Sequence, residues 1–268
     1  MASIAAEILA EVLRAAEGGP PIFVATVVSA TEGTPASLGA KMLVRRDGTS
    51  IGSLGDPVLD RAVLREAVAI FRRHGVRTVH YSLTGESISR QEAPGQPSYA
   101  VMVEVHERPA RLLIAGGGHI GHALSRIGAM CGFRVTVVDD RPEYANAGRF
   151  PDAAEVLRGR FDEVLSAYPI DGATYAVCVT RGHRHDEVSL HAMVGRGAAY
   201  VGMIGSRRRV KAVLQHLVED GADPDAVAAV HTPIGLDIGA ETPEEIAVSI
   251  MAEIIQVRRG GSGRPMKR

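Results

Sequence analysis

The stretch RLLIAGGGHIGHALSRIGAMCGFRVTVVDD (111–140) decides the fold of this chain. An apolar run at 111–115 predicts a strand, and an amphipathic segment a few residues later predicts a helix. Between them lies a G-x-G-x-x-G pattern, Gly116-Gly117-Gly118-His119-Ile120-Gly121. In that context Gly116 permits a tight turn, Gly118 lets the backbone approach a phosphate, and Gly121 lets the helix pack closely on the strand. Because the first N–H groups of a helix bind anionic oxygen, the stretch predicts a phosphate-binding turn.

The strand that follows the glycine turn, 134–140, ends on two acidic residues. Asp139 lies about 20 residues after the turn, where dinucleotide-binding folds place a carboxylate that accepts a ribose hydroxyl. Asp140 and Arg141 come next, and we count both among the candidate ligand contacts. The pattern predicts a Rossmann-like fold. It leaves open whether the turn binds a ligand or serves the fold alone.

The rest of the second half alternates between strands and helices. The predicted strands are 111–117, 134–140, 174–180 and 198–205, and the predicted helices are 119–132, 161–169, 187–197 and 207–221. Such alternation is typical of a doubly wound parallel sheet with helices on both faces. A last helix begins at Thr242, with Pro243 at its first position and Glu245 placed to close a capping box.

The segment before Pro109 follows a different pattern. The elements expected there are strands at 22–30, 76–83 and 99–106, a hairpin over 40–54 and a helix over 57–75. Asp47-Gly48 supplies the hairpin turn, and Pro109 interrupts both helix and sheet where the two patterns meet. The predicted organisation is a small mixed α/β domain at 1–108, a Rossmann-like domain at 109–258 and a disordered tail at 259–268.

Composition excludes several classes of protein. Over 268 residues the formal net charge is −1, so no basic excess favours nucleic acid or anionic lipid. Charged residues interrupt the apolar N-terminal segment, which therefore predicts neither a signal peptide nor a membrane span. The two cysteines, Cys131 and Cys178, lie in apolar contexts, so we expect buried structural thiols and a reducing, cytoplasmic environment.

Histidines and a carboxylate follow one predicted strand end, the place where doubly wound sheets bind their ligands. His183, His185 and Asp186 come directly after the strand at 174–180. Imidazole and carboxylate also suit a metal, but a complete site needs more ligands, and His231 is the one obvious addition. We therefore predict ligand contacts for His183 and Asp186, and no metal.

Basic residues follow another predicted strand end. Ser206 and Arg207 begin a helix there, together with Arg208 and Arg209. A small residue, free amides and guanidinium groups predict an anion cradle, and a solvated basic face is the alternative. A dehydrogenase also needs a proton donor or acceptor beside its substrate, and the sequence makes only a thin case for one.

Seven segments carry a resemblance to a known family. They are GTPASLGAKMLV (33–44), DGTSIGSLG (47–55), LLIAGGGHIGHAL (112–124), VVDDRPEYAN (137–146), VTRGHRHDEVSL (179–190), YVGMIGSRRRV (200–210) and HTPIGLDIGAETPEEIAVSIMAEII (231–255). Together they resemble the xanthine dehydrogenase accessory factor family, also called XdhC/CoxI. The last segment is the most specific, because generic Rossmann oxidoreductases do not require it.

The resemblance implies a maturation factor for molybdenum hydroxylases of the xanthine dehydrogenase or CO dehydrogenase type. Such a factor binds molybdenum cofactor, shelters it while a cysteine desulfurase partner sulfurates the metal, and hands it to the apo-enzyme. The glycine turn then cradles a pterin phosphate or an attached nucleotide. The resemblance also implies a family-specific N-terminal domain. The candidates for the other wall of the site in that domain are Gly33, Thr34, Pro35, Gly39, Ala40 and Lys41. Lys41 is a candidate to pair with a phosphate, with an amphipathic strand residue as the alternative, and Gly33 and Gly39 are alternatively turn residues.

One segment departs from the family pattern. Many members carry a glycine-rich segment with a cysteine after GSLG, whereas this chain has Gly55-Asp56-Pro57-Val58-Leu59-Asp60. A thiolate is a soft ligand and the carboxylate of Asp56 is a hard one, so sulfuration held by a thiolate of this chain is in doubt.

Three functions remain open from the sequence. The first is a cofactor-binding accessory protein, for which we expect a homodimer whose two domains close on the ligand. The second is an NAD(P)-dependent oxidoreductase, in which Asp139 favours NAD over NADP because a carboxylate repels a 2′-phosphate. The third is a nucleotide-binding module without chemistry.

Overall fold

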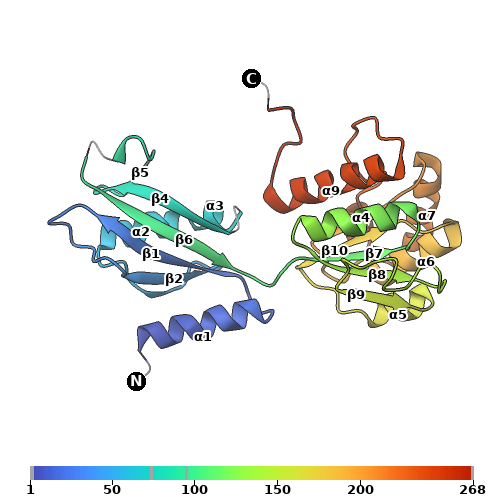
Figure 1. Cartoon of the computed structure of the whole chain (residues 1–268), viewed down its shortest axis with the longest axis horizontal. Coiled ribbons are helices and arrows are strands. Elements are labelled where there is room, and N and C mark those ends of the chain that lie inside the picture. Colours follow the sequence, from blue (N-terminus) through green and yellow to red (C-terminus); the bar gives the residue numbers. More distant parts are fainter. Residues whose placement is uncertain (1–2, 73–74, 94–95, 267–268) are drawn as a thin grey trace. The chain divides into compact units, whose positions relative to one another are not determined.

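The computed structural model describes residues 3–72, 75–93 and 96–266. The chain divides into two compact units, Met1–Arg108 and Pro109–Arg268, and each is described by itself (Figure 1). Within the described ranges, no helix combines the length and the apolar character that a membrane crossing requires.

Unit 1 is built on one antiparallel sheet with strand order β3-β2-β1-β6-β4-β5. Its strands are β1 (Ile22–Ala30), β2 (Lys41–Arg45), β3 (Ser50–Gly52), β4 (Val76–Ser82), β5 (Ser87–Ile88) and β6 (Ser98–His106). The hairpin predicted over 40–54 is confirmed, since β2 and β3 pair antiparallel. Gly48 takes a φ of +84° in its turn, and the Asp47 carboxylate accepts a hydrogen bond from the N–H of Thr49 at 2.9 Å.

Both faces of the unit 1 sheet are covered. Phe23, Ala25 and Val27 alternate along β1 into a core shared with α2 (Pro57–Arg65) and α3 (Ala67–Arg72). The intervening Ile22 and Val24 face α1 (Ile4–Ala16). The single helix predicted over 57–75 is wrong, because α2 ends before Glu66 and α3 begins after it. The Glu66 carboxylate accepts a hydrogen bond from the Tyr81 hydroxyl at 3.1 Å. Residues 73–74 lie outside the described ranges.

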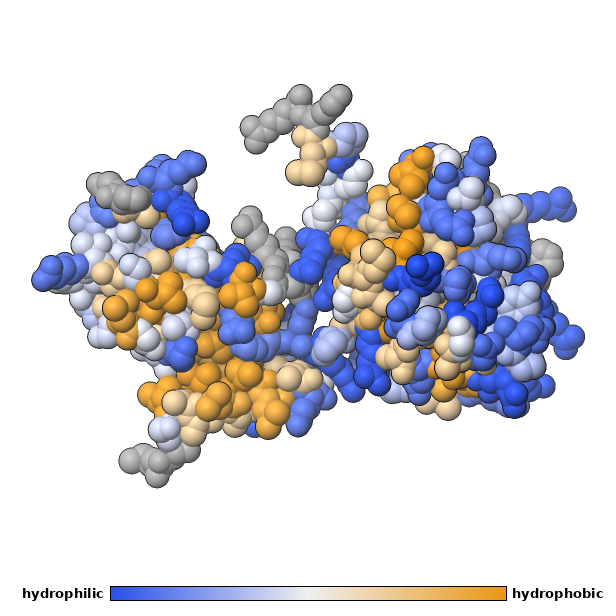
Figure 2. Space-filling model, in the orientation of Figure 1, coloured by the Kyte–Doolittle hydropathy of each residue, from blue (hydrophilic) through white to orange (hydrophobic). Residues whose placement is uncertain are grey.

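The first helix contributes to the surface as well as to the core. Ile8 and Ala15 of α1 are buried, whereas Leu9 and Leu13 are exposed. Figure 2 shows an apolar surface over this helix. Helix α1 therefore carries apolar side chains on two sides, and the sheet covers one of them.

Unit 2 confirms the predicted Rossmann-like fold. Its sheet is parallel throughout, with strand order β11-β10-β7-β8-β9. The strands are β7 (Arg111–Ala115), β8 (Arg134–Asp139), β9 (Glu155–Arg158), β10 (Thr174–Cys178) and β11 (Tyr200–Met203). Counted along the chain, this is the 3-2-1-4-5 order of the doubly wound fold, with the direction of winding reversing between β7 and β10. Ligands of such folds bind at the carboxyl ends of the strands near that reversal.

Helices cover both faces of the unit 2 sheet. Leu112 and Ile114 point into a core shared with α4 (His119–Met130) and α9 (Pro243–Arg259), which Figure 1 shows side by side. Leu113 and Ala115 point into the opposite core. The helices of that face are α5 (Phe161–Ala167), α6 (His183–Met193) and α7 (Arg207–Glu219), with α8 (Pro224–Ala228) beside them. Strand β7 therefore carries the glycine turn out of the most buried part of the unit.

Some of the predicted helix ends agree with the structure and others do not. The capping box of α9 is confirmed, because Thr242 accepts from the N–H of Glu245 and Glu245 accepts from the N–H of Thr242. The start of α6 is wrong by four residues, since the helix begins at His183 and not at Glu187. Strand β9 and helix α8 were not predicted, because each is short and lacks a clear period.

Candidate functional site

Three glycines of the turn after β7 are required by close packing. Gly116 has a φ of +117°, and a Cβ there would lie 2.5 Å from the carbonyl oxygen of Val179. A Cβ on Gly117 would lie 2.2 Å from the carbonyl oxygen of Tyr144, and one on Gly121 would lie 1.9 Å from that of Gly116. Because these neighbours are backbone atoms, no side chain fits at the three positions.

Gly118 differs from the other three glycines. A Cβ at this position would meet no heavy atom within 4 Å, so space is open above it in the described structure. Gly118 is the N-cap of α4, and no side chain of the described residues caps that helix. His119, the first helical residue, is exposed. The start of α4 therefore presents free amides to open space, which is the arrangement that binds an anion.

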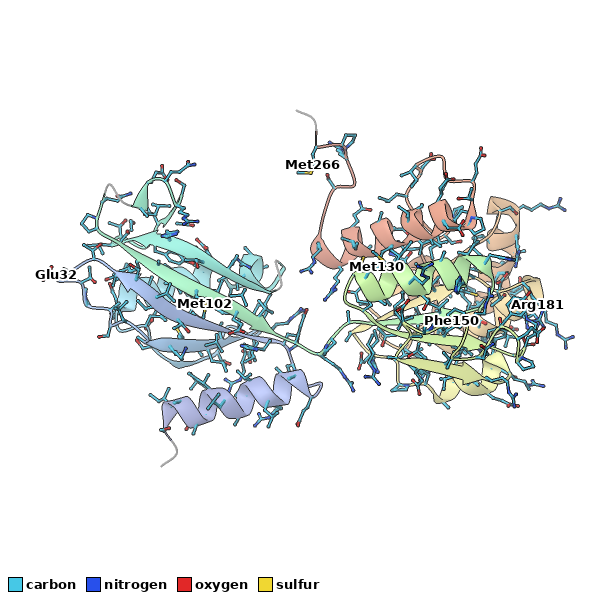
Figure 3. The ribbon with its side chains drawn as sticks, in the orientation of Figure 1. Glu32, Met102, Met130, Phe150, Arg181 and Met266 are labelled. Carbon is cyan, nitrogen blue, oxygen red and sulfur yellow. The ribbon has the colours of Figure 1, made fainter. Side chains whose placement is uncertain are left out.

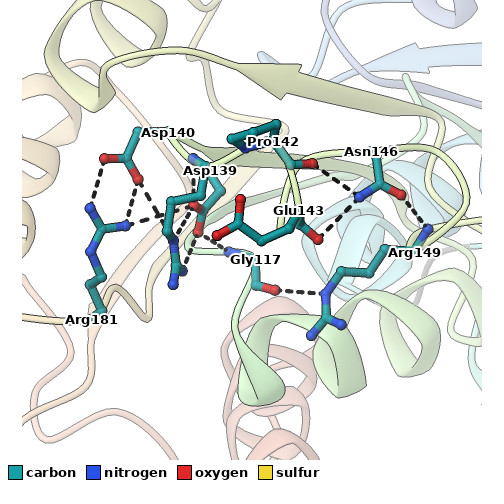
Figure 4. A network of polar contacts seen from close by, with 9 residues as sticks. Gly117, Asp139, Asp140, Pro142, Glu143, Asn146, Arg149 and Arg181 are labelled. Atoms are coloured by element: carbon teal, nitrogen blue, oxygen red, sulfur yellow. Dashed lines mark hydrogen bonds and ion pairs between the residues drawn. The ribbon is translucent and has the colours of Figure 1, made fainter.

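Asp139 is placed against the turn, but its carboxylate already has donors. Oδ2 accepts from the N–H of Gly117 at 2.9 Å and from Arg141 Nη2 at 3.0 Å. Oδ1 accepts from the backbone N–H of Arg141 at 3.0 Å and from its Nε at 2.9 Å (Figure 4). Asp139 is only 1% exposed. The carboxylate ties the end of β8 to the glycine turn.

Asp140 and Arg181 join two neighbouring loops at the same edge of the sheet. The two carboxylate oxygens of Asp140 accept from Arg181 Nη1 at 2.6 Å and Nη2 at 2.8 Å (Figure 4). Hydrogen bonding to this guanidinium holds the pKa of Asp140 below its ordinary value. Arg181 follows β10, so the pair connects the segments after β8 and β10.

The segment after Arg141 packs directly over the turn. The guanidinium carbon of Arg141 lies 3.6 Å from the ring centroid of Tyr144. Arg149 donates from Nε to the carbonyl oxygen of Gly117 at 3.1 Å, and its own backbone N–H donates to Asn146 Oδ1 at 2.9 Å. Phe150, labelled in Figure 3, packs edge-on against the His122 ring, with 5.6 Å between the ring centroids. The sequence pattern predicted no role for Tyr144, which lies in the segment VVDDRPEYAN, or for Arg149, which lies three residues after it.

Asp186 was expected to line the mouth of the site, and this is wrong. Because α6 begins at His183, Asp186 falls in its first turn and points inward, fully buried. Its carboxylate accepts from the Thr180 hydroxyl and lies 3.5 Å from the Cys178 thiol, and it forms an ion pair with Arg209. The side chain of His183 lies outside the described part of the structure.

The anion cradle predicted at the start of α7 is not assembled as expected. Ser206 Oγ accepts from the N–H of Arg209, so it caps the helix. The guanidinium of Arg209 is turned to Asp186, and Arg208 is exposed. The side chain of Arg207 is not among the described ones. Of the described side chains at this helix start, those of Ser206 and Arg209 serve the fold, and that of Arg208 extends to the surface.

The remaining histidines of interest lie apart from one another. His185 packs its ring on Phe161 at 5.5 Å between centroids. The His231 ring stacks on the Tyr200 ring with 4.5 Å between the centroids, and His231 Nδ1 lies 3.6 Å from Glu253 Oε1. Among the side chains that the structure describes, which do not include that of His183, no three His, Cys, Asp or Glu gather as metal ligands do.

Asp56 has a structural task in unit 1. It is buried, caps α2 by accepting from the N–H of Val58 at 2.8 Å, and accepts from the Tyr99 hydroxyl at 2.7 Å. Burial raises the pKa of Tyr99 to about 12. Lys41, exposed on β2, donates from Nζ to the Thr26 hydroxyl at 2.8 Å.

The two cysteines have opposite environments. Cys178 is buried as expected, and burial raises its pKa to about 12. The expectation for Cys131 is wrong, because it is exposed. It lies one residue past the end of α4, where the helix no longer covers it.

Two family descriptions match the chain. The one described as "XdhC and CoxI family" matches residues 15–82 in unit 1. The one described as "XdhC Rossmann domain" matches residues 112–254, which contain the glycine turn and nearly all of the parallel sheet.

Individual relatives agree with these matches. The chain is 30% identical over 257 residues to the "Uncharacterized protein YqeB" of Escherichia coli K12, covering 96% of this chain and 47% of the relative. It is 35% identical over 153 residues to a probable xanthine dehydrogenase component of Bacillus subtilis, covering 57% of this chain and 44% of the relative. The chain thus spans about half the length of the curated relatives it matches, or less.

One solved structure shares the fold. A crystal structure described as a xanthine dehydrogenase from Bacillus halodurans superposes with a TM-score of 0.54 at 22% identity. The likeness covers 97% of this chain and 96% of the other.

Proposed function

Because the chain belongs to the XdhC and CoxI family, we propose that it is an accessory protein of a molybdenum hydroxylase of the xanthine dehydrogenase or CO dehydrogenase type. In this proposal the protein binds molybdenum cofactor as cargo and delivers it to the apo-enzyme. The relatives whose names mention xanthine dehydrogenase support the type of client.

The open start of α4 is the observation that carries the proposal. Molybdenum cofactor supplies a pterin with a phosphate group, and a helix start with uncapped amides is suited to that group. Gly118 leaves the approach clear, while Gly116 and Gly117 hold the turn in the required shape. Exposed His119 lies at the first position of the helix, where it would flank a phosphate held by the amides.

The residues of this chain bind and orient the cargo but do not provide a thiolate to it. Asp56 is engaged as a helix cap, and the Cys178 thiol is buried with a raised pKa. Cys131 is exposed but lies at the far end of α4, about 18 Å along the helix from the turn. We therefore assign sulfuration of the cargo to a partner, a cysteine desulfurase, and only carriage to this chain.

The competing function is NAD(P)-dependent oxidation. It is favoured by the strand order β9-β8-β7-β10-β11, which dinucleotide-binding domains share. Fold alone does not separate the two functions, so NAD enters the test as a competitor.

The test is anaerobic equilibrium ultrafiltration of the full chain with molybdenum cofactor. Molybdenum and pterin fluorescence are read together in the retained fraction, with and without excess NAD. Stoichiometric retention of both, unaffected by NAD, is the expected result. Retention of NAD without molybdenum or pterin would overturn the proposal.

A further inference from the structure

We infer that the glycine turn of unit 2 takes a terminal phosphate monoester whose counter-charge is Arg149, and that Asp139 locks the turn and does not read a ribose. This inference rests on the proposed function for the class of ligand. It adds which end of the ligand is recognised and by which residues.

The hydrogen-bonding capacity of the Asp139 carboxylate is already used. A carboxylate offers about four lone-pair positions. Four donors already reach it, the N–H of Gly117 and three groups of Arg141. A ribose hydroxyl would have to displace bonds to a guanidinium, which are roughly twice as strong as neutral ones. The position that reads a ribose in dinucleotide-binding folds is therefore closed here.

Protein atoms also lie in the space next to that position. Arg141 lies over the Tyr144 ring, with its guanidinium carbon 3.6 Å from the ring centroid. The carbonyl oxygen of Tyr144 comes so close to Gly117 that a Cβ would meet it at 2.2 Å. The Arg141 side chain and the Tyr144 backbone thus occupy part of the region beyond the end of β8, against which the nucleoside half of a dinucleotide lies in folds of this type.

The arginines around the turn differ in whether a carboxylate neutralises their charge. Three arginines surround the turn, and two of them have carboxylate partners, Arg141 with Asp139 and Arg181 with Asp140. Arg149 has no carboxylate partner among the described residues. Its Nε is fixed on the carbonyl oxygen of Gly117, which leaves Nη1 and Nη2 as unused donors beside the start of α4 (Figure 4).

The charges match a monoester better than a diester. A phosphate monoester carries about −1.5 to −2 at neutral pH. A helix N-terminus acts as about +0.5 of an elementary charge, and together with one arginine it exceeds the single negative charge of a diester. With Arg149 added, the positive charge rises to about +1.5, close to that of the dianion. Asn146 supports this use, because it holds the backbone of Arg149 in place.

The experiment measures binding of four probes to the full chain. The probes are a 6-substituted pterin phosphate, the same pterin after phosphatase treatment, 5′-AMP and NAD. Pterin binding is followed by fluorescence anisotropy, and the nucleotides are tested as competitors. We expect removal of the phosphate to weaken pterin binding about 30-fold, and NAD to compete far more weakly than the pterin phosphate.

Variants of arginine separate the subsite from general charge. Arg149→Gln is expected to weaken the phosphorylated pterin about 10-fold and to leave the dephosphorylated one unchanged. Arg134→Gln removes the same charge at the first residue of β8, on the opposite edge of the sheet, and is expected to change neither. Arg149→Lys keeps the charge and is expected to bind between the wild type and Arg149→Gln. Melting temperatures check that each variant is folded, and the comparison of probes on the wild type requires no variant.

The outcomes separate this inference from the proposed function. Equal binding of the pterin with and without phosphate would overturn the inference and leave cofactor carriage standing. Binding of 5′-AMP that depends on Arg149, without binding of the pterin phosphate, would support the subsite and overturn the molybdenum cofactor as its source. NAD binding as tight as that of the pterin phosphate would overturn the closed ribose position.

Discussion

Two helices begin at the same edge of the parallel sheet, and they begin in opposite ways. Helix α4 follows β7 and starts at Gly118, without a side-chain cap and with open space above it. Helix α7 follows β11 and starts at Ser206, which caps it. Arg209 in the first turn of α7 is directed inward to Asp186. Of these two starts, the one at α4 offers unused amides to a ligand.

The comparison shows that basic residues do not by themselves make an anion site. The run Arg207–Arg209 looked like a cradle in the sequence, whereas the segment around Arg149 attracted no notice. In the structure, Arg209 of α7 forms an ion pair with the fully buried Asp186 of α6. Arg149 keeps unused donors next to a glycine turn. What distinguishes Arg209 from Arg149 is whether the guanidinium already has a carboxylate partner among the described residues.

The largest effect on stability is expected from breaking the ion pair between Asp186 and Arg209. Asp186→Ala leaves the half-buried Arg209 without its partner, and we expect unit 2 to lose about 3 kcal/mol of unfolding free energy. Cofactor binding per folded molecule is expected to stay unchanged. Urea denaturation followed by circular dichroism measures the first, and ultrafiltration the second.

The control for this variant is Arg208→Ala. Arg208 is exposed in the same helical turn, and its replacement is expected to change stability by less than about 0.5 kcal/mol. If Asp186→Ala abolished binding while the fold kept its stability, the start of α7 would be a ligand site after all.

The next effect is expected from filling the open start of α4. Gly118→Glu places a bulky anion where we propose that the phosphate binds, and we expect cofactor affinity to fall at least about 100-fold. The fold is expected to survive, because an acidic side chain near a helix N-terminus is favourable. Affinity is measured by ultrafiltration and stability by melting temperature.

Gly118→Ala is the matched variant for the backbone. Its Cβ meets no atom within 4 Å, and the φ of −64° at this position suits alanine. We expect its melting temperature to match that of the wild type and its affinity to fall far less than that of Gly118→Glu. Unchanged affinity in Gly118→Glu would place the ligand elsewhere.

A smaller effect is expected at Asp56 of unit 1, in the segment that departs from the family pattern. Asp56→Ala removes a helix cap and leaves the buried Tyr99 hydroxyl without its acceptor, so unit 1 is expected to lose about 2 kcal/mol. Asp56→Asn keeps an acceptor for the cap and is expected to lose less. Retention of molybdenum by either folded variant is expected to equal that of the wild type, and a specific loss would make Asp56 a ligand.

The smallest effect is expected at the exposed pair of Asp140 and Arg181. Because the folded pKa of Asp140 is lowered, its stabilising contribution is present above its unfolded pKa and is lost as the pH falls through the folded value. Arg181→Gln is expected to raise this pKa toward its ordinary value and to cost under about 1 kcal/mol at neutral pH. A carboxyl NMR titration of both proteins measures the shift, and an unchanged pKa would contradict the assigned cause.

Local patterns predicted much of the fold. The glycine turn, the alternation of strands and helices, and the capping box at Thr242 each depend on neighbours within a few residues, and the structure has all three. Short elements without a period, such as β9, depend on a partner strand far along the chain. That partner is invisible in a local pattern.

The candidate site was harder to predict because its features depend on tertiary contacts. Whether Asp139 reads a ribose depends on Arg141 folding back onto it, and whether Asp186 is exposed depends on where α6 begins. Arg149 reaches Gly117 across 32 residues of sequence. Cys131 looked buried in sequence because its neighbours are apolar, yet it lies just beyond the helix that would have covered it.

The most direct test of the account follows backbone amide chemical shifts while the pterin phosphate is added to the isotope-labelled full chain. We predict that the amides of Gly118, His119 and Ile120 shift with the probe, together with the Arg149 Nε–H, and that those of Ser206–Arg209 do not. Shifts at the start of α7, with the start of α4 unmoved, would contradict the central claim that the open glycine turn is the ligand site.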